Sequence, residues 1–228
     1  MKTTFFIIFS FCGNYLFSQI KLELKLDFDD KIADITIVNN SSENYAFPLD
    51  KSFLRPYEPE CFNYQEYEGD FPFLALMLMI EKQNNNELLT YYVEDYVDPV
   101  KFDSITREYQ KEKKKYDNLI ENWRIINKIK KMKDAKINYS IMNSFVYLKP
   151  NEKINYKVRI NINNITNQKF KFYSYSYDSF QTYKYYLEYC DVSKAYEYLT
   201  KKQKKEIKEK GYTLFCNKIT SNFYIDKR

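Results

Sequence analysis

Clustered carboxylates are the residues of this chain whose type and spacing come closest to a catalytic arrangement. Glu94, Asp95 and Asp98 follow an apolar segment. A glycosidase needs two carboxyl groups about 5–9 Å apart, one of them with a raised pKa. Such pairs also arise by chance on an acid-rich surface, so we interpret these residues as surface charges. A carboxylate-dependent hydrolase acting on glycans is kept as the alternative function.

A second acidic cluster, four aspartates within residues 27–34, raises the question of a calcium site. Calcium takes about 6–8 oxygen ligands at fixed offsets, and the glycine of an EF-hand loop is missing here. Asp34 also lies within a predicted strand. We therefore interpret the cluster as a solvated acidic turn.

The composition excludes several kinds of chemistry. The 228-residue chain has no histidine and only 3 glycines. Ser-His-Asp catalysis, Cys-His catalysis and His-ligated zinc are ruled out, and phosphate-cradling loops need more glycine. Three cysteines beyond the N-terminal segment are too few for a Cys-only zinc site, which needs four. The sequence therefore predicts no catalytic residue, no cofactor and no metal ligand.

These three cysteines can form one disulfide. Cys190 ends a predicted strand and Cys216 lies in another, with a predicted helix over 192–210 between them. Because strands linked by a helix can return side by side, we expect a Cys190–Cys216 disulfide and a free Cys61. In the chain-entropy model this cross-link contributes about 3 kcal/mol.

A tyrosine-dense stretch between residues 173 and 189 allows two interpretations. Several flat rings on one exposed face would bind sugars or peptides, whereas buried rings would fill the core. We favour the core interpretation. The tyrosines concerned are Tyr173, Tyr175, Tyr177, Tyr183, Tyr185, Tyr186 and Tyr189.

A basic segment ends the longest predicted helix. Lys128, Lys130, Lys131 and Lys133 are expected to project into solvent, where they could contact anionic lipid or polysaccharide; a solvated helix face is the alternative. Nucleic acid is not an expected partner, because no recognition motif is present. The partner classes that remain are an envelope protein, a glycan or an anionic surface.

The first 18 residues have the order of a secretory signal peptide. A lysine precedes a short apolar run over residues 5–11, and a small residue stands before Gln19. The run is too short to span a bilayer, which needs about 20 apolar residues, and no later segment reaches that length either. Cys12 would suit a lipoprotein, but the bulky Phe11 stands where a small residue is needed. We expect cleavage before Gln19 and a periplasmic, secreted or cell-surface protein without a transmembrane segment.

Periodicity predicts a mainly β protein. Residues 20–28 and 33–39 alternate apolar and polar side chains and should form a hairpin. Residues 73–80 are continuously apolar, which favours a buried central strand. Further strands are predicted over 137–148 and 154–162.

Helical spacing predicts one long inserted helix over about 104–133 and a shorter one over 192–210, in which Thr200 and Gln203 can form a capping box. Gly211 is expected to end the shorter helix in a left-handed conformation. An apolar stripe on the longer helix should bury against the sheet. Its members are Ile105, Tyr109, Tyr116, Leu119, Trp123 and Ile126.

Two segments resemble small exported bacterial proteins with an Ig-like β-sandwich. Residues 34–42 (DITIVNNSS) match the strand and Asn-Asn-Ser turn of such domains. Residues 148–152 (LKPNE) and 156–158 (YKV) match their Leu-Lys-Pro-Gly-Glu turn and following strand, with Asn151 in place of glycine. The resemblance covers about residues 20–48 and 137–162, and the long helix departs from it.

The resemblance implies an Ig-like antiparallel β-sandwich and a binding or accessory role. We expect residues 19–228 to form a single such domain, and the leading hypothesis is a non-enzymatic protein of the cell envelope. A protease inhibitor with an exposed loop is a third hypothesis, which rests only on analogy with proteins of the same fold.

Overall fold

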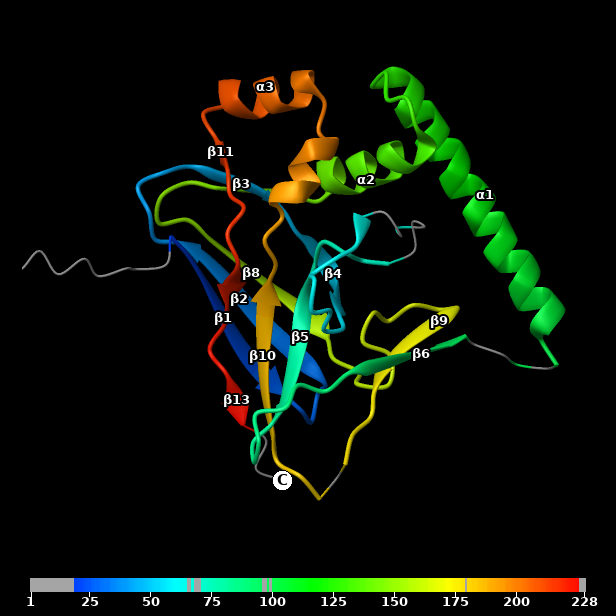
Figure 1. Cartoon of the computed structure of the whole chain (residues 1–228), viewed down its shortest axis with the longest axis vertical. Coiled ribbons are helices and arrows are strands. Elements are labelled where there is room, and N and C mark those ends of the chain that lie inside the picture. The colour runs from blue at the N-terminus through cyan, green and yellow to red at the C-terminus, as the bar shows by residue number, and fades with distance from the viewer. Residues whose placement is uncertain are drawn as a thin grey trace, which may run out of the picture.

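The computed structural model describes residues 19–64, 67, 71–95, 98, 100–178 and 180–225. The predicted signal peptide over residues 1–18 lies outside them. Strands dominate the fold and are arranged in several sheets, with helices gathered at one end and along one side (Figure 1). Among the described residues, no helix combines the length and apolar character needed to cross a membrane.

The predicted N-terminal hairpin is confirmed and forms part of a three-stranded antiparallel sheet. β1 (Ile20–Asp27) pairs along its full length with β2 (Ile32–Asn39), and β2 pairs on its other side with β8 (Lys153–Arg159). Alternate side chains of β1 and β2 are buried, as the period of two requires. The turn before β8 places Asn151 at φ 61°, a left-handed conformation that glycine adopts most readily.

The central sheet is built around the predicted apolar strand. β5 (Ala75–Lys82) pairs antiparallel with β10 (Tyr183–Tyr189) and parallel with β4 (Asp50–Arg55). β12 (Ile219–Thr220) and β13 (Tyr224–Ile225) both pair with β10. Because β5 has neighbours on both sides and is buried on both faces, its sequence is continuously apolar from Ala75 to Ile80 rather than alternating.

Two smaller sheets complete the β structure. β3 (Tyr45–Pro48) pairs antiparallel with β7 (Phe145–Leu148) and parallel with β11 (Thr213–Leu214). β6 (Tyr91–Asp95) pairs antiparallel with β9 (Lys171–Tyr175). The two parallel pairings, β4 with β5 and β11 with β3, depart from the purely antiparallel arrangement predicted from the sequence. One continuous hydrophobic core contains side chains of the first three sheets.

The prediction of one helix over 104–133 followed by a strand from residue 137 is wrong. α1 (Phe102–Ile126) and α2 (Met132–Asn143) are separate helices joined by a five-residue turn, and the following strand, β7, begins only at Phe145. Lys128 in the turn has φ 55°, which an α-helix does not allow. α2 buries Ile137 and Ile141, one helical turn apart, so the segment follows a helical period.

α1 packs against α2 rather than flat against a sheet, and this overturns the predicted stripe. Ile120 is the buried residue of α1, whereas Leu119 is 46% exposed and Ile126 76% exposed. Trp123 packs edge-on against Tyr139 of α2, with ring centroids 5.3 Å apart. α1 therefore runs along the side of the molecule and reaches beyond the sheets (Figure 1).

The C-terminal helical segment follows the local signals read from the sequence. A 3₁₀-helix, η2 (Ser193–Tyr198), precedes α3 (Lys201–Glu209), and both hydrogen bonds of the Thr200–Gln203 capping box are present. Gly211 has φ 80° and ends the helix as expected.

A buried amide joins the four helical segments at this end of the molecule. Asn138 of α2 is fully buried and donates to the Tyr198 carbonyl at 2.8 Å and to Gln203 Oε1 at 2.7 Å. Its Oδ1 accepts from Trp123 Nε1 at 2.8 Å and from Gln203 Nε2 at 3.1 Å. Because every polar atom of this side chain is paired, α1, α2, η2 and α3 are fixed relative to one another.

Candidate functional site

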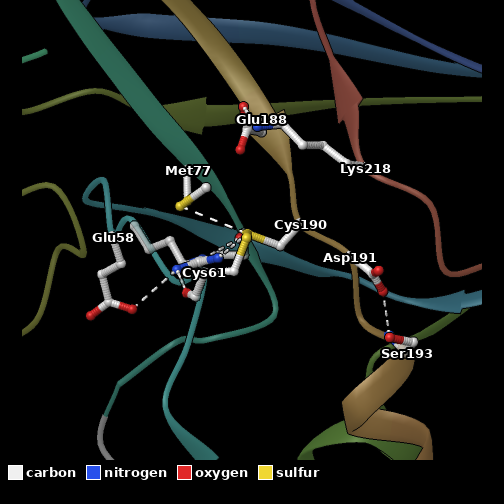
Figure 2. The surroundings of a disulfide bond; sticks show 10 residues. Glu58, Cys61, Met77, Glu188, Cys190, Asp191, Ser193 and Lys218 are labelled. Carbon is white, nitrogen blue, oxygen red and sulfur yellow. Dashed lines mark hydrogen bonds and ion pairs between the residues drawn. A yellow bond between two sulfur atoms is a disulfide. The ribbon is translucent and has the colours of Figure 1, made fainter.

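The disulfide of the structure joins Cys61 to Cys190, with their Cα atoms 5.8 Å apart, and leaves Cys216 free (Figure 2). The predicted Cys190–Cys216 pair is therefore wrong. Cys190 packs in a small cluster with Met77 and Met79, whereas Cys216 packs against the main hydrophobic core. Cys216 lies between β11, which pairs with β3, and β12, which pairs with β10 in the register Tyr189↔Ile219, so no strand pairing sets Cys216 opposite Cys190.

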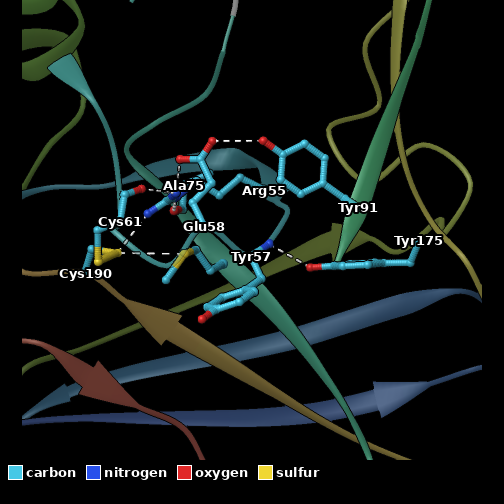
Figure 3. A network of polar contacts seen from close by, with 9 residues as sticks. Arg55, Tyr57, Glu58, Cys61, Ala75, Tyr91, Tyr175 and Cys190 are labelled. Atoms are coloured by element: carbon cyan, nitrogen blue, oxygen red, sulfur yellow. Dashed lines mark hydrogen bonds and ion pairs between the residues drawn. A yellow bond between two sulfur atoms is a disulfide. The ribbon is translucent and has the colours of Figure 1, made fainter. Parts of the chain in front are cut away.

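A buried arginine lies against this disulfide. Arg55, at the end of β4, is 1% exposed. Its Nη2 donates to Cys190 Sγ at 2.9 Å, its Nη1 to the Cys61 carbonyl at 2.6 Å and its Nε to the Ala75 carbonyl at 3.0 Å (Figure 3). Burial lowers the pKa of Arg55 to about 10, so the guanidinium remains charged at neutral pH.

Glu58 balances this charge and extends the network toward the β6–β9 sheet. Its Oε2 lies 3.5 Å from Arg55 Nη1, and its Oε1 accepts from the Tyr91 hydroxyl at 3.1 Å (Figure 3). Nearby, Tyr175 accepts from the Tyr57 backbone N–H at 2.7 Å and donates to the Leu78 carbonyl at 2.6 Å. A charge-assisted network thus fixes the loop after β4 to β5, β10 and the β6–β9 sheet.

Burial perturbs several tyrosines around and beyond this network. It raises the pKa of Tyr64, Tyr91 and Tyr186 to about 12 in each case. Proximity to Glu58 adds to the effect at Tyr91, and proximity to Glu81 adds to it at Tyr186. These phenols stay neutral at physiological pH, and the hydroxyls of Tyr91 and Tyr186 donate hydrogen bonds to Glu58 and Glu81.

Cys61, Cys190 and Glu188 have their potential ligand atoms within 4.8 Å of one another. Both sulfur atoms are taken up by the disulfide, and Glu188 pairs with Lys218 at 2.7 Å (Figure 2). A cation at this place would also face the Arg55 guanidinium. In its oxidised state the cluster is therefore a structural cross-link and does not offer a metal centre.

The carboxylates considered for catalysis lie on the surface. Glu94 and Asp95 are exposed on β6. Asp98 accepts hydrogen bonds from the backbone N–H groups of Val100 and Lys101, just before α1. None of these arrangements supplies the enclosed, desolvated acid that a glycosidase uses.

The acidic turn at residues 27–34 is ordered by its own backbone. Asp27 Oδ1 accepts from the N–H groups of Asp29 and Asp30, both at 3.0 Å, and Asp29 and Asp30 are exposed. This arrangement agrees with the interpretation of a solvated turn.

Most members of the tyrosine-dense stretch are buried, as the favoured interpretation predicted. Tyr177 and Tyr186 are half-buried, and Tyr177 stacks on Tyr183 at 4.5 Å between ring centroids. Together with Phe28 and Tyr185, Tyr177 lines a surface pocket of about 430 Å³. The fully buried members are Tyr173, Tyr175, Tyr183, Tyr185 and Tyr189.

Three of the four predicted basic contact residues lie in the turn between α1 and α2. Lys128, Lys130 and Lys131 are exposed there, as expected. Lys133 lies in the first turn of α2 and is half-buried, so it is less exposed than the other three lysines. Sequence reasoning missed Arg55, although an arginine between Leu54 and Pro56, after an apolar pair, was a signal of an unusual environment.

Comparison with known proteins finds no matching family model, no matching curated protein and no matching solved structure.

Proposed function

We propose that this chain is an exported, non-enzymatic binding or accessory protein of the cell envelope. The observation that carries the proposal is the Cys61–Cys190 disulfide, which joins segments 129 residues apart. Disulfides of this kind form and persist in oxidising compartments outside the cytosol. The N-terminal pattern of a signal peptide supports the same compartment.

The scaffold we propose is an Ig-like β-sandwich with helical additions. The β1–β2–β8 sheet and the central sheet share one hydrophobic core, which supports two stacked layers. The helices and the two parallel pairings are departures from a plain sandwich. A binding role suits this architecture better than catalysis does. The buried charged groups form structural hydrogen bonds and ion pairs, so they are not available as catalytic acids or bases.

Protein isolated from its natural host tests the proposal. Edman sequencing should find an N-terminus at Gln19 or within a few residues of it. Peptide mapping without reductant should join the peptide of Cys61 to that of Cys190. An intact Met1 together with unpaired Cys61 and Cys190 would overturn the export claim.

The functional part of the proposal is tested separately. Crosslinking in intact cells, followed by purification from envelope fractions, should recover the chain with a bound envelope component. Glycan hydrolysis by the purified protein, lost when both Glu94 and Asp95 are changed to Gln and Asn, would replace the proposal with the hydrolase alternative.

A further inference from the structure

The turn between α1 and α2, together with the helix ends on either side (residues 125–132, here called the corner), exposes apolar and basic side chains side by side. Ile125 is 60% exposed, Ile126 76% and Met132 36%. The three lysines of the corner are exposed as well. The corner contains no acidic residue, so its own sequence supplies no counter-charge.

Hydrogen bonds hold the corner in this conformation. Arg124 forms a bidentate ion pair with Glu121, at 2.6 and 2.7 Å. The same guanidinium donates to the carbonyls of Ile129 and Lys130, both at 3.4 Å. Lys128 takes the left-handed backbone conformation that reverses the chain. The turn is therefore fixed by hydrogen bonds, and Ile125 and Ile126 are exposed without any rearrangement of the chain.

α3 adds further positive charge at the same end of the molecule (Figure 1). Gln203 Nε2 of α3 donates to Asn127 Oδ1 of the corner at 3.3 Å, so the two segments are in contact. Glu206 and Glu209 lie 3.8 and 3.5 Å from their lysine partners. Residues 201–210 hold six lysines against these two acids, so the segment keeps a net charge of +4. The exposed lysines of the first half of α3 are Lys201, Lys202, Lys204 and Lys205.

We propose that the corner docks on the surface of an anionic phospholipid membrane, with α3 contributing to the charge attraction. Aliphatic side chains can enter the headgroup region while the surrounding lysines meet lipid phosphates, and stable attachment takes both signals. A glycan would instead call for flat aromatic rings, and the corner has none. The inference rests on the proposed function, because an exported protein of the envelope faces a membrane surface.

The size of the effect follows from the charges. Each lysine near an anionic surface changes the partition coefficient about fivefold, so three lysines together amount to about a hundredfold. Replacing the two isoleucines with polar residues should lower the partition coefficient by a further factor of about ten or more, because their side chains no longer enter the apolar boundary of the membrane. Raised salt should weaken the charge contribution and leave the apolar one.

Vesicle co-sedimentation with the purified protein, as its host makes it, provides the test. The vesicles are phosphatidylcholine alone and phosphatidylcholine mixed with phosphatidylglycerol. One variant combines Lys128→Gln, Lys130→Gln and Lys131→Gln, and a second combines Ile125→Ser with Ile126→Ser. Since every changed residue is exposed, the fold should be retained, and circular dichroism checks this.

Matched control variants remove the same kinds of side chain, lysines and an exposed apolar residue, from other parts of the surface. Lys113→Gln, Lys114→Gln and Lys115→Gln take three exposed charges from the middle of α1. Phe180→Ser removes an apolar side chain that is 97% exposed in the connection between β9 and β10. The unchanged protein should bind the anionic vesicles and not the neutral ones. Each corner variant should bind at least about tenfold more weakly, and the controls should bind within about twofold of the unchanged protein.

Three results would overturn the inference: no binding to anionic vesicles, equal losses in the control variants, or binding that the isoleucine changes leave intact. The last result would indicate attraction by charge alone, without docking of the corner in the headgroup region. Failure of vesicle binding in a protein that is processed at Gln19 and carries the Cys61–Cys190 disulfide would leave the proposed function standing. An unprocessed chain with free thiols would refute the proposed function independently.

Discussion

Replacing both members of the disulfide, Cys61→Ser with Cys190→Ser, should cost this protein a large part of its stability. The cross-linked residues are 129 positions apart. In the chain-entropy model, a loop of that length gives about 5 kcal/mol at 25 °C. The Cys190–Cys216 pair expected from the sequence would have given only about 3 kcal/mol, because it closes a much shorter loop. Domains of this kind have about 5–15 kcal/mol of stability in total, so the variant should be marginal.

Urea unfolding provides the measurement. Trp123 is the single tryptophan, and it packs between α1 and α2, so its fluorescence reports on the helical end. Far-UV circular dichroism reports on the sheets. The double variant should unfold at much lower urea than the unchanged protein. Treatment of the unchanged protein with reductant should reproduce that shift, since both perturbations release the same loop.

Cys216→Ser is the matched control. Cys216 is free and half-buried, so its loss should change the free energy of unfolding by about 1 kcal/mol or less. The reasoning is refuted if Cys216→Ser destabilises the protein as much as the double variant does. It is equally refuted if a peptide map without reductant joins Cys190 to Cys216.

Two further perturbations test the interior. Asn138→Leu should cost about 3 kcal/mol in urea unfolding, because Trp123 Nε1 and both polar atoms of Gln203 lose a buried partner; Asn143→Leu, at an exposed site on the same helix, is the control and should cost under about 1 kcal/mol. The fold should also be lost between about pH 10 and 12, measured by circular dichroism with tyrosinate absorbance. Burial raises the pKa of several tyrosines to about 12, so the unfolded chain releases protons that the folded chain retains, and stability falls as the pH rises. Arg55, whose folded pKa is lowered, acts in the opposite direction but is a single group, and unchanged ellipticity at pH 12 would contradict this account.

Patterns of short range predicted the parts of the fold that depend on neighbours in the chain. The alternation over residues 20–39 predicted β1 and β2, because a half-buried strand must present one apolar face. The Thr200–Gln203 capping box and the left-handed Gly211 were also predicted, since each depends on groups within a few residues. The absence of histidine excluded whole classes of catalysis without any structure.

The errors share a different physical origin. The segment over 137–148 was predicted as a strand, because its apolar residues are compatible with either period. Residues 137–143 belong to α2, because Asn138, Ile137 and Ile141 find their partners on one side, against η2 and the core. The end of the segment, β7 (Phe145–Leu148), is a strand as predicted. Ile126 was assigned to a buried stripe, but α1 leaves the sheets and its apolar end faces solvent.

The candidate site was the part least accessible from sequence. The sequence by itself determined that the three cysteines beyond residue 18 allow one disulfide and that histidine-based chemistry is excluded, because these are properties of which atoms the chain contains. Only the tertiary structure decided that Cys61 is the partner of Cys190. The choice depends on where the loop after Arg55 returns, because that loop carries Cys61 to the end of β10. In the same way, the sequence determined that lysines follow α1. Packing of α1 on α2 decided that two isoleucines stand exposed beside them, because burial depends on contacts between segments far apart in the chain.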